Sequence, residues 1–332
     1  MDRSAVPLNF GLEFQANAAI VLMLENMEEM NSIRLERNED IDIELVDGSY
    51  VLAQAKSVVK ASTDFANVRV NVKKAMESLS DGAKKVKAKE LVFISNSPNP
   101  FNDDESRTLF WGPSVVRYNE LPPTAKNMIQ GYLSQIREPL DTNLLSIRTI
   151  PFEGDDERQR YKAVYNVIQG FLDGFDLNER GFWKRLHEIW GGMLDRSGTK
   201  ADKKITLAKK DVVWPIIVCV TGHGIIKTDT SYCLELDEGE FEEVSNKYAE
   251  IIDYCSARYE LVAKVISDFT LSGIKGNDAI KQFINDHWND YKDDLGVDGI
   301  DGYIQASLVK IIMYSILVKR IAINRIKKTV KL

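Results

Sequence analysis

Four polar side chains with the chemistry of a metal site lie on two short segments of the sequence. Asp40 and Asp42 alternate with isoleucines in the stretch DIDIEL, and Gln54 and Lys56 close the apolar stretch YVLAQAK. Because side chains alternate across a strand, each pair is expected to lie on one face of its strand. The Asp-Gly pair at 47–48 is favoured in tight turns. The sequence therefore predicts a hairpin on which carboxylates, an amide and an ammonium group converge.

These groups suit phosphodiester chemistry with a divalent cation. Mg²⁺ takes a few oxygen ligands and keeps several waters. Either aspartate, with the Gln54 side-chain oxygen or a backbone carbonyl, can hold Mg²⁺ or Mn²⁺ against a scissile phosphate. Lys56 can stabilise charge on the phosphorane or lower the pKa of an attacking water. An ordinary solvated β-ribbon has a similar pattern, but the second arm is apolar until Gln54, which favours a site.

The elements that must position these groups follow from periodicity. Apolar residues recur at three- and four-residue steps over Gly11–Met30, which predicts a helix. Further helices are expected at Phe65–Ser80 and Pro123–Arg137, and strands at Ile33–Glu36, Asp40–Leu45, Tyr50–Lys56, Glu90–Ser95 and Leu144–Phe152. This order predicts a mixed α/β domain over residues 1–150.

Four short motifs of this first half, taken together, resemble a known nuclease family. They are GLEFQ (Gly11–Gln15), ERNEDIDIEL (Glu36–Leu45), LAQAKS (Leu52–Ser57) and FISNS (Phe93–Ser97). The set resembles the PD-(D/E)xK nucleases, in the branch that has QxK in place of the acid-x-Lys triplet. It is most similar to the nuclease domain of bacterial antiphage effectors, namely the CBASS endonuclease that carries a SAVED sensor and the effector subunit of Lamassu systems.

The resemblance covers about residues 8–100 and implies both a fold and an activity. The fold is restriction-endonuclease-like, a central mixed sheet flanked by helices, and the activity is Mg²⁺- or Mn²⁺-dependent cleavage of double-stranded DNA. It implies that Asp40 or Asp42 binds the metal and that Gln54 occupies the usual acid position as a further ligand. Lys56 would be the catalytic lysine.

The first helix is expected to support this site. In the related effectors its glycine-aromatic-glutamine opening precedes the acidic strand, which implies supporting roles for Glu13 and Gln15. The sequence departs from the family at Gln54, a weaker metal ligand than Glu, and at Phe14, where the family often has Tyr.

Long helical patterns dominate residues 151–332. They cover Glu157–Leu172, Asn178–Met193, Glu240–Leu271, Asn277–Lys292 and Asp301–Lys328, while Asp211–Thr221 suits either a strand or a helix. We expect this half to be a helical interaction and oligomerisation domain. By analogy with Lamassu, the resemblance implies an SMC-like ATPase and a small accessory subunit as partners that control activity, and a homo-oligomer when active.

The charge balance limits how DNA can be bound. The 332 residues carry a formal net charge of -7, whereas proteins that coat nucleic acid are usually basic. DNA contact therefore requires a metal, a partner or a local basic run such as Lys84, Lys85 and Lys87. A solvated helix end and loop is the favoured interpretation of that run, with a phosphate-backbone contact as the alternative. The three cysteines and three histidines share no ligand spacing, which disfavours a zinc site or a disulfide framework.

The sequence shows neither a targeting signal nor a membrane-spanning pattern. The N-terminus lacks the pattern of a signal peptide, and the apolar stretch Ile304–Ile323 contains charged residues, so we expect a cytoplasmic protein without a membrane span. Two other functions stay open: a catalytically inactive nuclease fold that binds DNA or a partner, and a structural adaptor whose charged hairpin is solvated surface.

Overall fold

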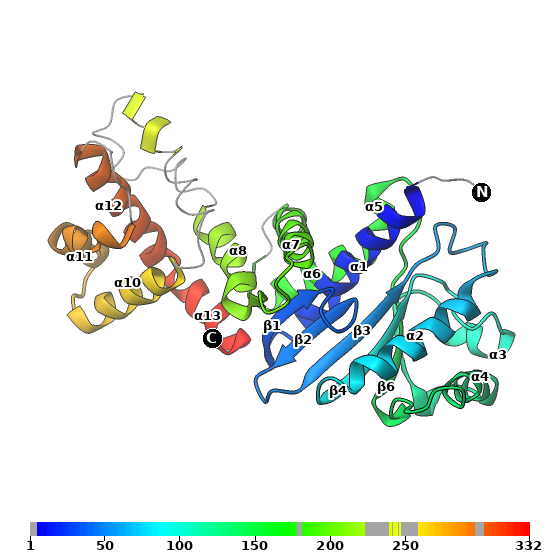
Figure 1. Cartoon of the computed structure of the whole chain (residues 1–332). Helices are drawn as coiled ribbons and strands as arrows, with labels where there is room; N and C mark the ends of the chain where they lie inside the picture. The colour runs from blue at the N-terminus through cyan, green and yellow to red at the C-terminus, as the bar shows by residue number, and fades with distance from the viewer. Residues whose placement is uncertain are drawn as a thin grey trace. The chain divides into compact units, whose positions relative to one another are not determined.

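The chain forms two compact units, Met1–Lys209 and Lys210–Leu332. The computed structural model describes residues 5–177, 181–222, 239–240, 242–244, 246, 258–295 and 302–332. The first unit contains a mixed sheet flanked by helices, and the second is helical (Figure 1). This confirms the expected sheet with flanking helices and the helix-rich C-terminal part.

The sheet of the first unit has seven strands in the order β5-β6-β4-β3-β2-β1-β7. They are β1 (Met30–Leu35), β2 (Ile41–Leu45), β3 (Tyr50–Lys56), β4 (Ala88–Ser95), β5 (Ser114–Arg117), β6 (Leu145–Thr149) and β7 (Leu207–Ala208). β1, β2 and β3 form an antiparallel meander, and β3, β4 and β6 run parallel. The edge strands β5 and β7 are antiparallel to their neighbours.

Helices cover both faces of this sheet (Figure 1). Those of the first unit are α1 (Val6–Glu25), α2 (Val68–Ala83), α3 (Asp104–Arg107), α4 (Pro123–Leu133), α5 (Glu157–Arg160), α6 (Lys162–Asp173) and α7 (Phe182–Gly198). Helices α2 and α4 bury Met76 and Ile129 against Leu52 and Phe93 of the sheet. Helix α1 packs on the opposite side, between the sheet and helices α6 and α7. Being enclosed on several sides, it buries an almost continuous run from Phe14 to Leu24.

The predicted hairpin is the part of the sheet that matters most for a site. The observed strand β3 has the predicted bounds Tyr50–Lys56, and β2 pairs with it antiparallel from Ile41 to Glu44. Gly48 has a φ of 77° in the turn, a conformation that glycine adopts without the steric cost of a Cβ. Helix α2 then connects β3 to the parallel strand β4, as a parallel crossover requires.

The boundary predicted near residue 150 lies inside the first compact unit, which continues to Lys209. Helices α6 and α7 pack on α1, and β7 adds an edge strand beside β1. The buried Arg34 guanidinium donates to the carbonyl oxygens of Lys200 and Asp202 at 2.6 and 2.7 Å. The composition changes near 150 because strands give way to helices there, but those helices still cover the sheet.

The second unit contains α8 (Lys209–Gly222), α10 (Arg258–Ser272), α11 (Ala279–His287), α12 (Gly302–Val318) and α13 (Arg320–Val330). The ambiguous segment at 211–221 is helical, as α8. The long helix expected over Asp301–Lys328 is divided into α12 and α13, and much of the helix expected over Glu240–Leu271 lies outside the described residues. Within the described part of the chain, every helix is too short or too polar for a bilayer crossing.

Candidate active site

The carboxylate of Asp40 is the centre of the polar cluster at the end of the hairpin. Its Oδ2 accepts hydrogen bonds from the Gln54 side-chain amide, from the Ala55 backbone N–H at 2.9 Å and from Lys56 Nζ at 3.4 Å. The pairing of Ile41 with Ala53 explains this contact, because in an antiparallel pair the preceding residue, Asp40, then faces Gln54. The structure therefore brings three of the four predicted residues together.

Asp42 has a different set of partners. Its carboxylate is 2% exposed and accepts from the Asn38 N–H at 2.9 Å, the Asn38 side-chain amide at 2.8 Å and the Glu39 N–H at 3.2 Å. These bonds fold the loop between β1 and β2 back over the start of β2. Asp40 and Asp42 occupy equivalent positions in the alternating sequence pattern, but their contacts differ. Asp40 contacts Gln54 and Lys56, whereas Asp42 contacts the loop between β1 and β2.

Gln15 from α1 holds the same loop from the other direction. Its amide donates to the Asp40 backbone carbonyl and to the Glu36 carboxylate, both at 2.8 Å. Glu36 itself has a φ of 58°, and its N–H donates to the Asp40 carbonyl at 3.2 Å. The last residue of GLEFQ therefore contacts the backbone of Asp40 and not its carboxylate.

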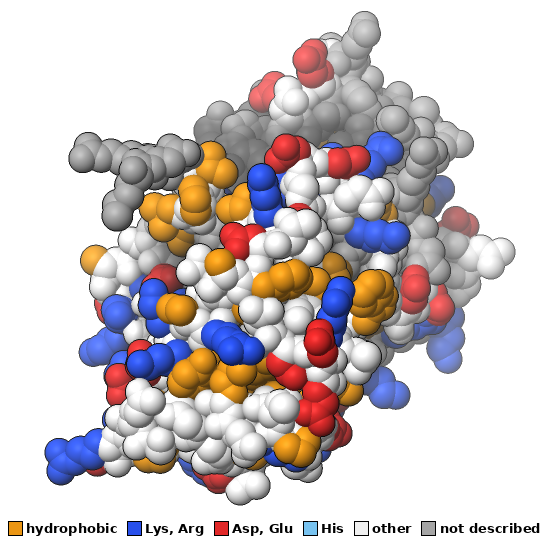
Figure 2. All heavy atoms as spheres, turned by 90° about the vertical axis from the view of Figure 1, so that its right-hand side faces the viewer, with side chains coloured by type: hydrophobic (Ala, Val, Ile, Leu, Met, Phe, Trp, Pro, Cys, Tyr) orange, Lys and Arg blue, Asp and Glu red, His pale blue; other side chains and the backbone are white. Residues whose placement is uncertain are grey.

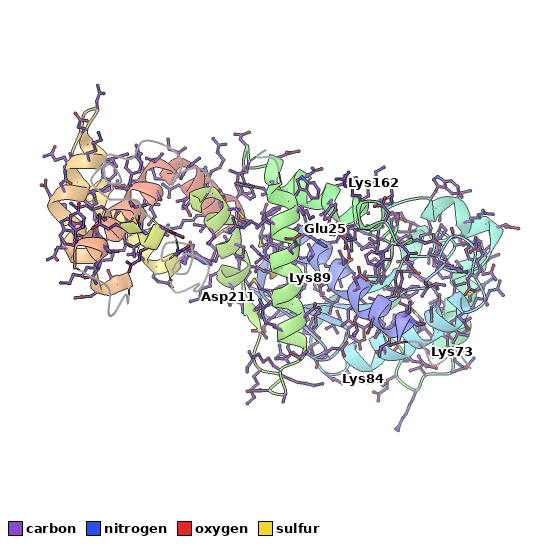
Figure 3. The ribbon with its side chains drawn as sticks, turned by 90° about the horizontal axis from the view of Figure 1, so that it is seen from above. Glu25, Lys73, Lys84, Lys89, Lys162 and Asp211 are labelled. Atoms are coloured by element: carbon purple, nitrogen blue, oxygen red, sulfur yellow. The ribbon has the colours of Figure 1, made fainter. Side chains whose placement is uncertain are left out.

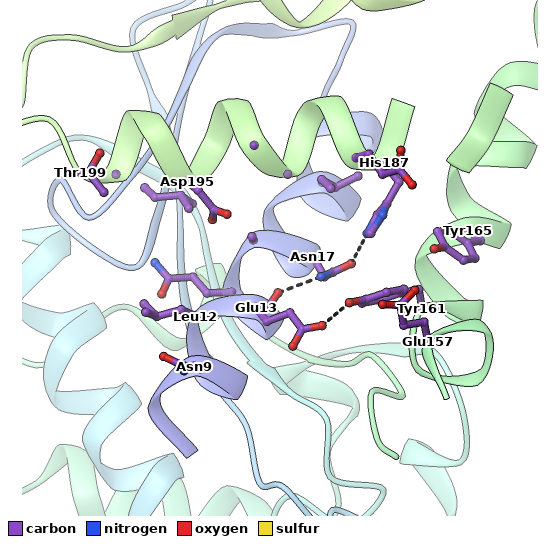
Figure 4. A pocket seen from close by; sticks show the side chains of 18 of the residues that line it. Asn9, Leu12, Glu13, Asn17, Glu157, Tyr161, Tyr165, His187, Asp195 and Thr199 are labelled. Atoms are coloured by element: carbon purple, nitrogen blue, oxygen red, sulfur yellow. Dashed lines mark hydrogen bonds between the residues drawn. The ribbon is translucent and has the colours of Figure 1, made fainter. Parts of the chain in front are cut away.

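Glu13 has no described contact with the Asp40 carboxylate and lines a cavity of about 630 Å³ between α1 and α7, which Gln15 and Glu36 also line. Its carboxylate accepts from the Tyr161 hydroxyl and from Arg160 at 3.2 Å. One turn further along α1, Asn17 contacts His187 of α7 at 2.7 Å (Figure 4). Glu13 therefore helps α1 to pack against α5–α7, and the described contacts give it no direct role at Asp40.

Burial sets the electrostatics of the cluster. It raises the pKa of the Asp40 carboxyl above its usual value, against the opposing effects of Lys56, the Ala55 N–H and Gln54. Burial raises the pKa of Asp42 in the same way and that of Glu39 to about 7. In the sequence, Glu39 and Asp40 form an adjacent acidic pair like that of the related family, but no site role was predicted for Glu39. Burial therefore disfavours the charged form of each of these carboxyl groups unless hydrogen-bond donors or a positive charge stabilise it.

The cluster offers few acidic side chains as metal ligands. Among the described residues, no three His, Cys, Asp or Glu side chains gather in a way that could hold a metal ion. Asp40 Oδ1 accepts no hydrogen bond from any residue that the structure describes, so it is available as a ligand. Such a donor set suits Mg²⁺, which is often held by one or two carboxylates with water and substrate phosphates completing its shell.

The FISNS motif fixes the chain that follows Lys56. Asn96 donates to the carbonyls of Val58 and Phe152 at 2.8 and 2.7 Å, and accepts from the Val58 N–H at 2.8 Å. Ser95 is the register partner of Lys56 in the neighbouring strand. The sequence singled out this motif but did not assign these contacts, because the partners of Asn96 lie 38 and 56 residues away.

The basic run at 84–87 extends from the end of α2 to the end of β3 that is remote from Lys56. Lys84 caps the end of α2 (Figure 3) and pairs with Asp81 at 3.0 Å. The Lys87 carbonyl accepts from the Tyr50 N–H, and Tyr50 is six residues before Lys56 on β3. Six residues of extended strand place Tyr50 and Lys56, at the two ends of β3, about 20 Å apart. Lys85 is close enough to Glu39 to lower its pKa.

The surface charge is mixed rather than uniformly basic on the face seen in Figure 2. There, Lys and Arg side chains are interspersed with Asp and Glu side chains and with separate hydrophobic patches.

No protein-family model, curated protein or solved structure matches the chain. Its own residues must therefore carry any assignment of function.

Proposed function

We propose that this protein is a metal-dependent DNA endonuclease of the PD-(D/E)xK kind, in its QxK form, with a restriction-endonuclease-like first unit. The observation that carries the proposal is the convergence of Gln54 and Lys56 on the Asp40 carboxylate. The acid stands just before β2 and the QxK triplet ends β3, which is the arrangement that the sequence resemblance implies.

Each residue has a task that follows from its contacts. Asp40 would hold Mg²⁺ or Mn²⁺ through its available oxygen, and Gln54 and the Ala55 N–H keep that carboxylate oriented. When bound, the cation would polarise the scissile phosphate and acidify an attacking water. The Lys56 ammonium, 3.4 Å from Asp40, is placed to neutralise charge that develops on the phosphate oxygens. Asp42 and Gln15 would position the loop.

Regulation by assembly belongs to the same proposal. The resemblance to antiphage effectors supports a role in a CBASS or Lamassu system, with the helical second unit as the part that docks partners. An SMC-like ATPase encoded beside this chain would support the Lamassu arrangement, and a cyclic-nucleotide synthase would support CBASS.

Cleavage of plasmid DNA tests the activity. Wild-type protein, alone and with its co-encoded partners, is expected to cut with Mg²⁺ or Mn²⁺ but not after chelation, and Lys56→Ala is expected to lose at least about a hundredfold in rate. Lys73→Ala is a matched control, since Lys73 is a half-buried lysine of α2 that pairs with Glu77 at 4.0 Å (Figure 3). Equal cutting by Lys56→Ala would remove the site assignment.

An inactive DNA- or partner-binding module is the second candidate. It is favoured by one observation, that the Gln54 amide and Lys56 both already contact the same Asp40 oxygen. DNA binding without cleavage, in the presence of metal, partners and DNA ends, would support this module and count against the nuclease.

A further inference from the structure

Four polar residues form a row across the sheet that begins at Lys56. In register, Lys56 of β3 lies opposite Ser95 of β4, Ser95 opposite Thr149 of β6, and Thr149 opposite Ser114 of β5. Register partners in neighbouring strands project to the same face. The row therefore runs from the proposed catalytic lysine toward the β5 edge of the sheet.

A cavity of about 410 Å³ lies at this end of β4 and β6. Its walls include Phe65, Phe110, Trp111 and Phe152, together with Arg107 and Thr149. This volume is within the range of pockets that bind small organic groups. All the wall residues belong to the first compact unit.

Trp111 is the unusual member of this wall. It is 77% exposed, although tryptophan is one of the side chains that gain most from burial. It follows a short 3₁₀ turn, Thr108–Phe110, and precedes Gly112, whose φ is 82°. The turn thus holds a large aromatic surface in solvent beside a cavity, an arrangement suited to stacking.

Thr149 provides an independent sign that the cavity takes a ligand. The residue is 2% exposed, and its hydroxyl has no hydrogen-bond partner among the described residues. The Ser114 hydroxyl, next in the row, is also buried without a described partner. A buried hydroxyl without a partner costs about 1–3 kcal/mol, so a polar atom of a ligand at Thr149 would recover that cost.

Arg107 adds a positive charge at the rim. It is exposed and, within the described part of the chain, has no ion-pair partner. The acid that also lines the cavity, Glu153, is engaged by the N–H and hydroxyl of Ser62 at 3.1 and 2.9 Å. These groups suit a nucleotide: a base can stack on the aromatic plane, and its polar edge can bond with the unpartnered hydroxyl. The unpaired arginine can contact the phosphate.

We propose that this cavity binds an unpaired nucleobase of the DNA strand, stacked on Trp111, with Thr149 at the base edge and Arg107 at a flanking phosphate. The proposal rests on the proposed nuclease function and names its substrate class, DNA with an unpaired base near the cut. Thr149 is two strands from Lys56, about 10 Å away at the usual strand spacing, so the base in the cavity lies near the nucleotide that is cut.

The test is a binding measurement in the full-length Lys56→Ala protein, which separates recognition from cleavage. The probes are a short fluorescein-labelled single strand of DNA and a strand of equal length in which every nucleotide is abasic. Trp111→Ala is expected to weaken binding of the base-containing strand by about 5- to 150-fold and to leave the abasic strand unchanged. Trp111→Phe should retain most of the affinity.

Val115→Ala is the matched control, because Val115 is 51% exposed on the neighbouring strand and does not line the cavity. Since Trp111 is largely exposed, its replacement should leave thermal unfolding unchanged. Equal affinity of Trp111→Ala for the base-containing strand, or an equal loss for both probes, overturns the pocket even if wild-type protein cuts DNA. A Trp111-dependent preference for bases in a wild-type protein that never cuts would keep the pocket and remove the nuclease.

Discussion

Replacing Asp40 and Asp42 one at a time separates a chemical role from a structural one. The two residues are identical in type and in strand parity, yet Asp40 contacts Gln54 and Lys56 while Asp42 contacts the loop at 38–39. We expect Asp40→Asn to abolish cleavage with little change in stability. We expect Asp42→Asn to lower stability and to retain cleavage in the molecules that stay folded.

The stability effect of Asp42→Asn follows from counting donors. The carboxylate accepts three hydrogen bonds, two of them from backbone N–H groups. An asparagine has one accepting oxygen and an NH₂ group that can only donate, so at least one donor near it loses its partner. That loss costs about 1–3 kcal/mol, which lowers the melting temperature of a domain of this size by about 2–12 °C.

The activity effect of Asp40→Asn follows from its place in the cluster. Burial already raises the pKa of this carboxyl, so a neutral amide removes a burial cost along with the attraction of Lys56, and the two changes oppose each other. The net change in unfolding free energy should stay within about 1 kcal/mol. Loss of the proposed metal ligand should lower the cleavage rate at least about a hundredfold.

Plasmid cleavage with Mg²⁺ and thermal unfolding by circular dichroism measure the two effects on the same samples. Asp47→Asn is the control, since Asp47 is exposed in the hairpin turn and bonds only with Ser49 among the described residues. Normal cutting by Asp40→Asn, or a fully folded Asp42→Asn protein that is as inactive as Asp40→Asn, would contradict these roles.

Three further predictions concern the scaffold of the first unit. Burial lowers the pKa of His187 to about 4 from its usual 6.5; because the unfolded chain binds the proton more tightly, this histidine contributes stability above pH 6.5 that is lost as pH falls toward 4. Urea unfolding should show that His187→Gln removes up to about 3 kcal/mol of this pH dependence, and an unchanged slope would contradict the burial. Asn96→Ala leaves three backbone groups at Val58 and Phe152 without their partner and should cost about 3 kcal/mol by the same measurement, with wild-type stability as the opposing result. Gly48→Ala should cost about 1–2 kcal/mol because φ is positive there, whereas Gly48→Asn should be milder, and equal stability of both would argue for a different turn.

Local sequence determined the hairpin and the residues that it could present. Strict alternation over DIDIEL, the Asp-Gly turn and an apolar arm that ends in Gln54 and Lys56 predicted β2 and β3, and the bounds of β3 are confirmed. These features depend on neighbours within a few residues, which is why they can be derived from sequence. The mixed sheet with flanking helices followed in the same way from the order of the patterns.

Tertiary structure decided which acid joins the cluster and what surrounds it. A period of two cannot distinguish Asp40 from Asp42; the choice depends on strand register and on Gln15, 25 residues away, which fixes the loop. The row from Lys56 to Ser114 unites four strands, and the first unit extends to Lys209 because later helices cover α1. Such contacts depend on how segments distant in the sequence pack together, so local sequence patterns do not predict them.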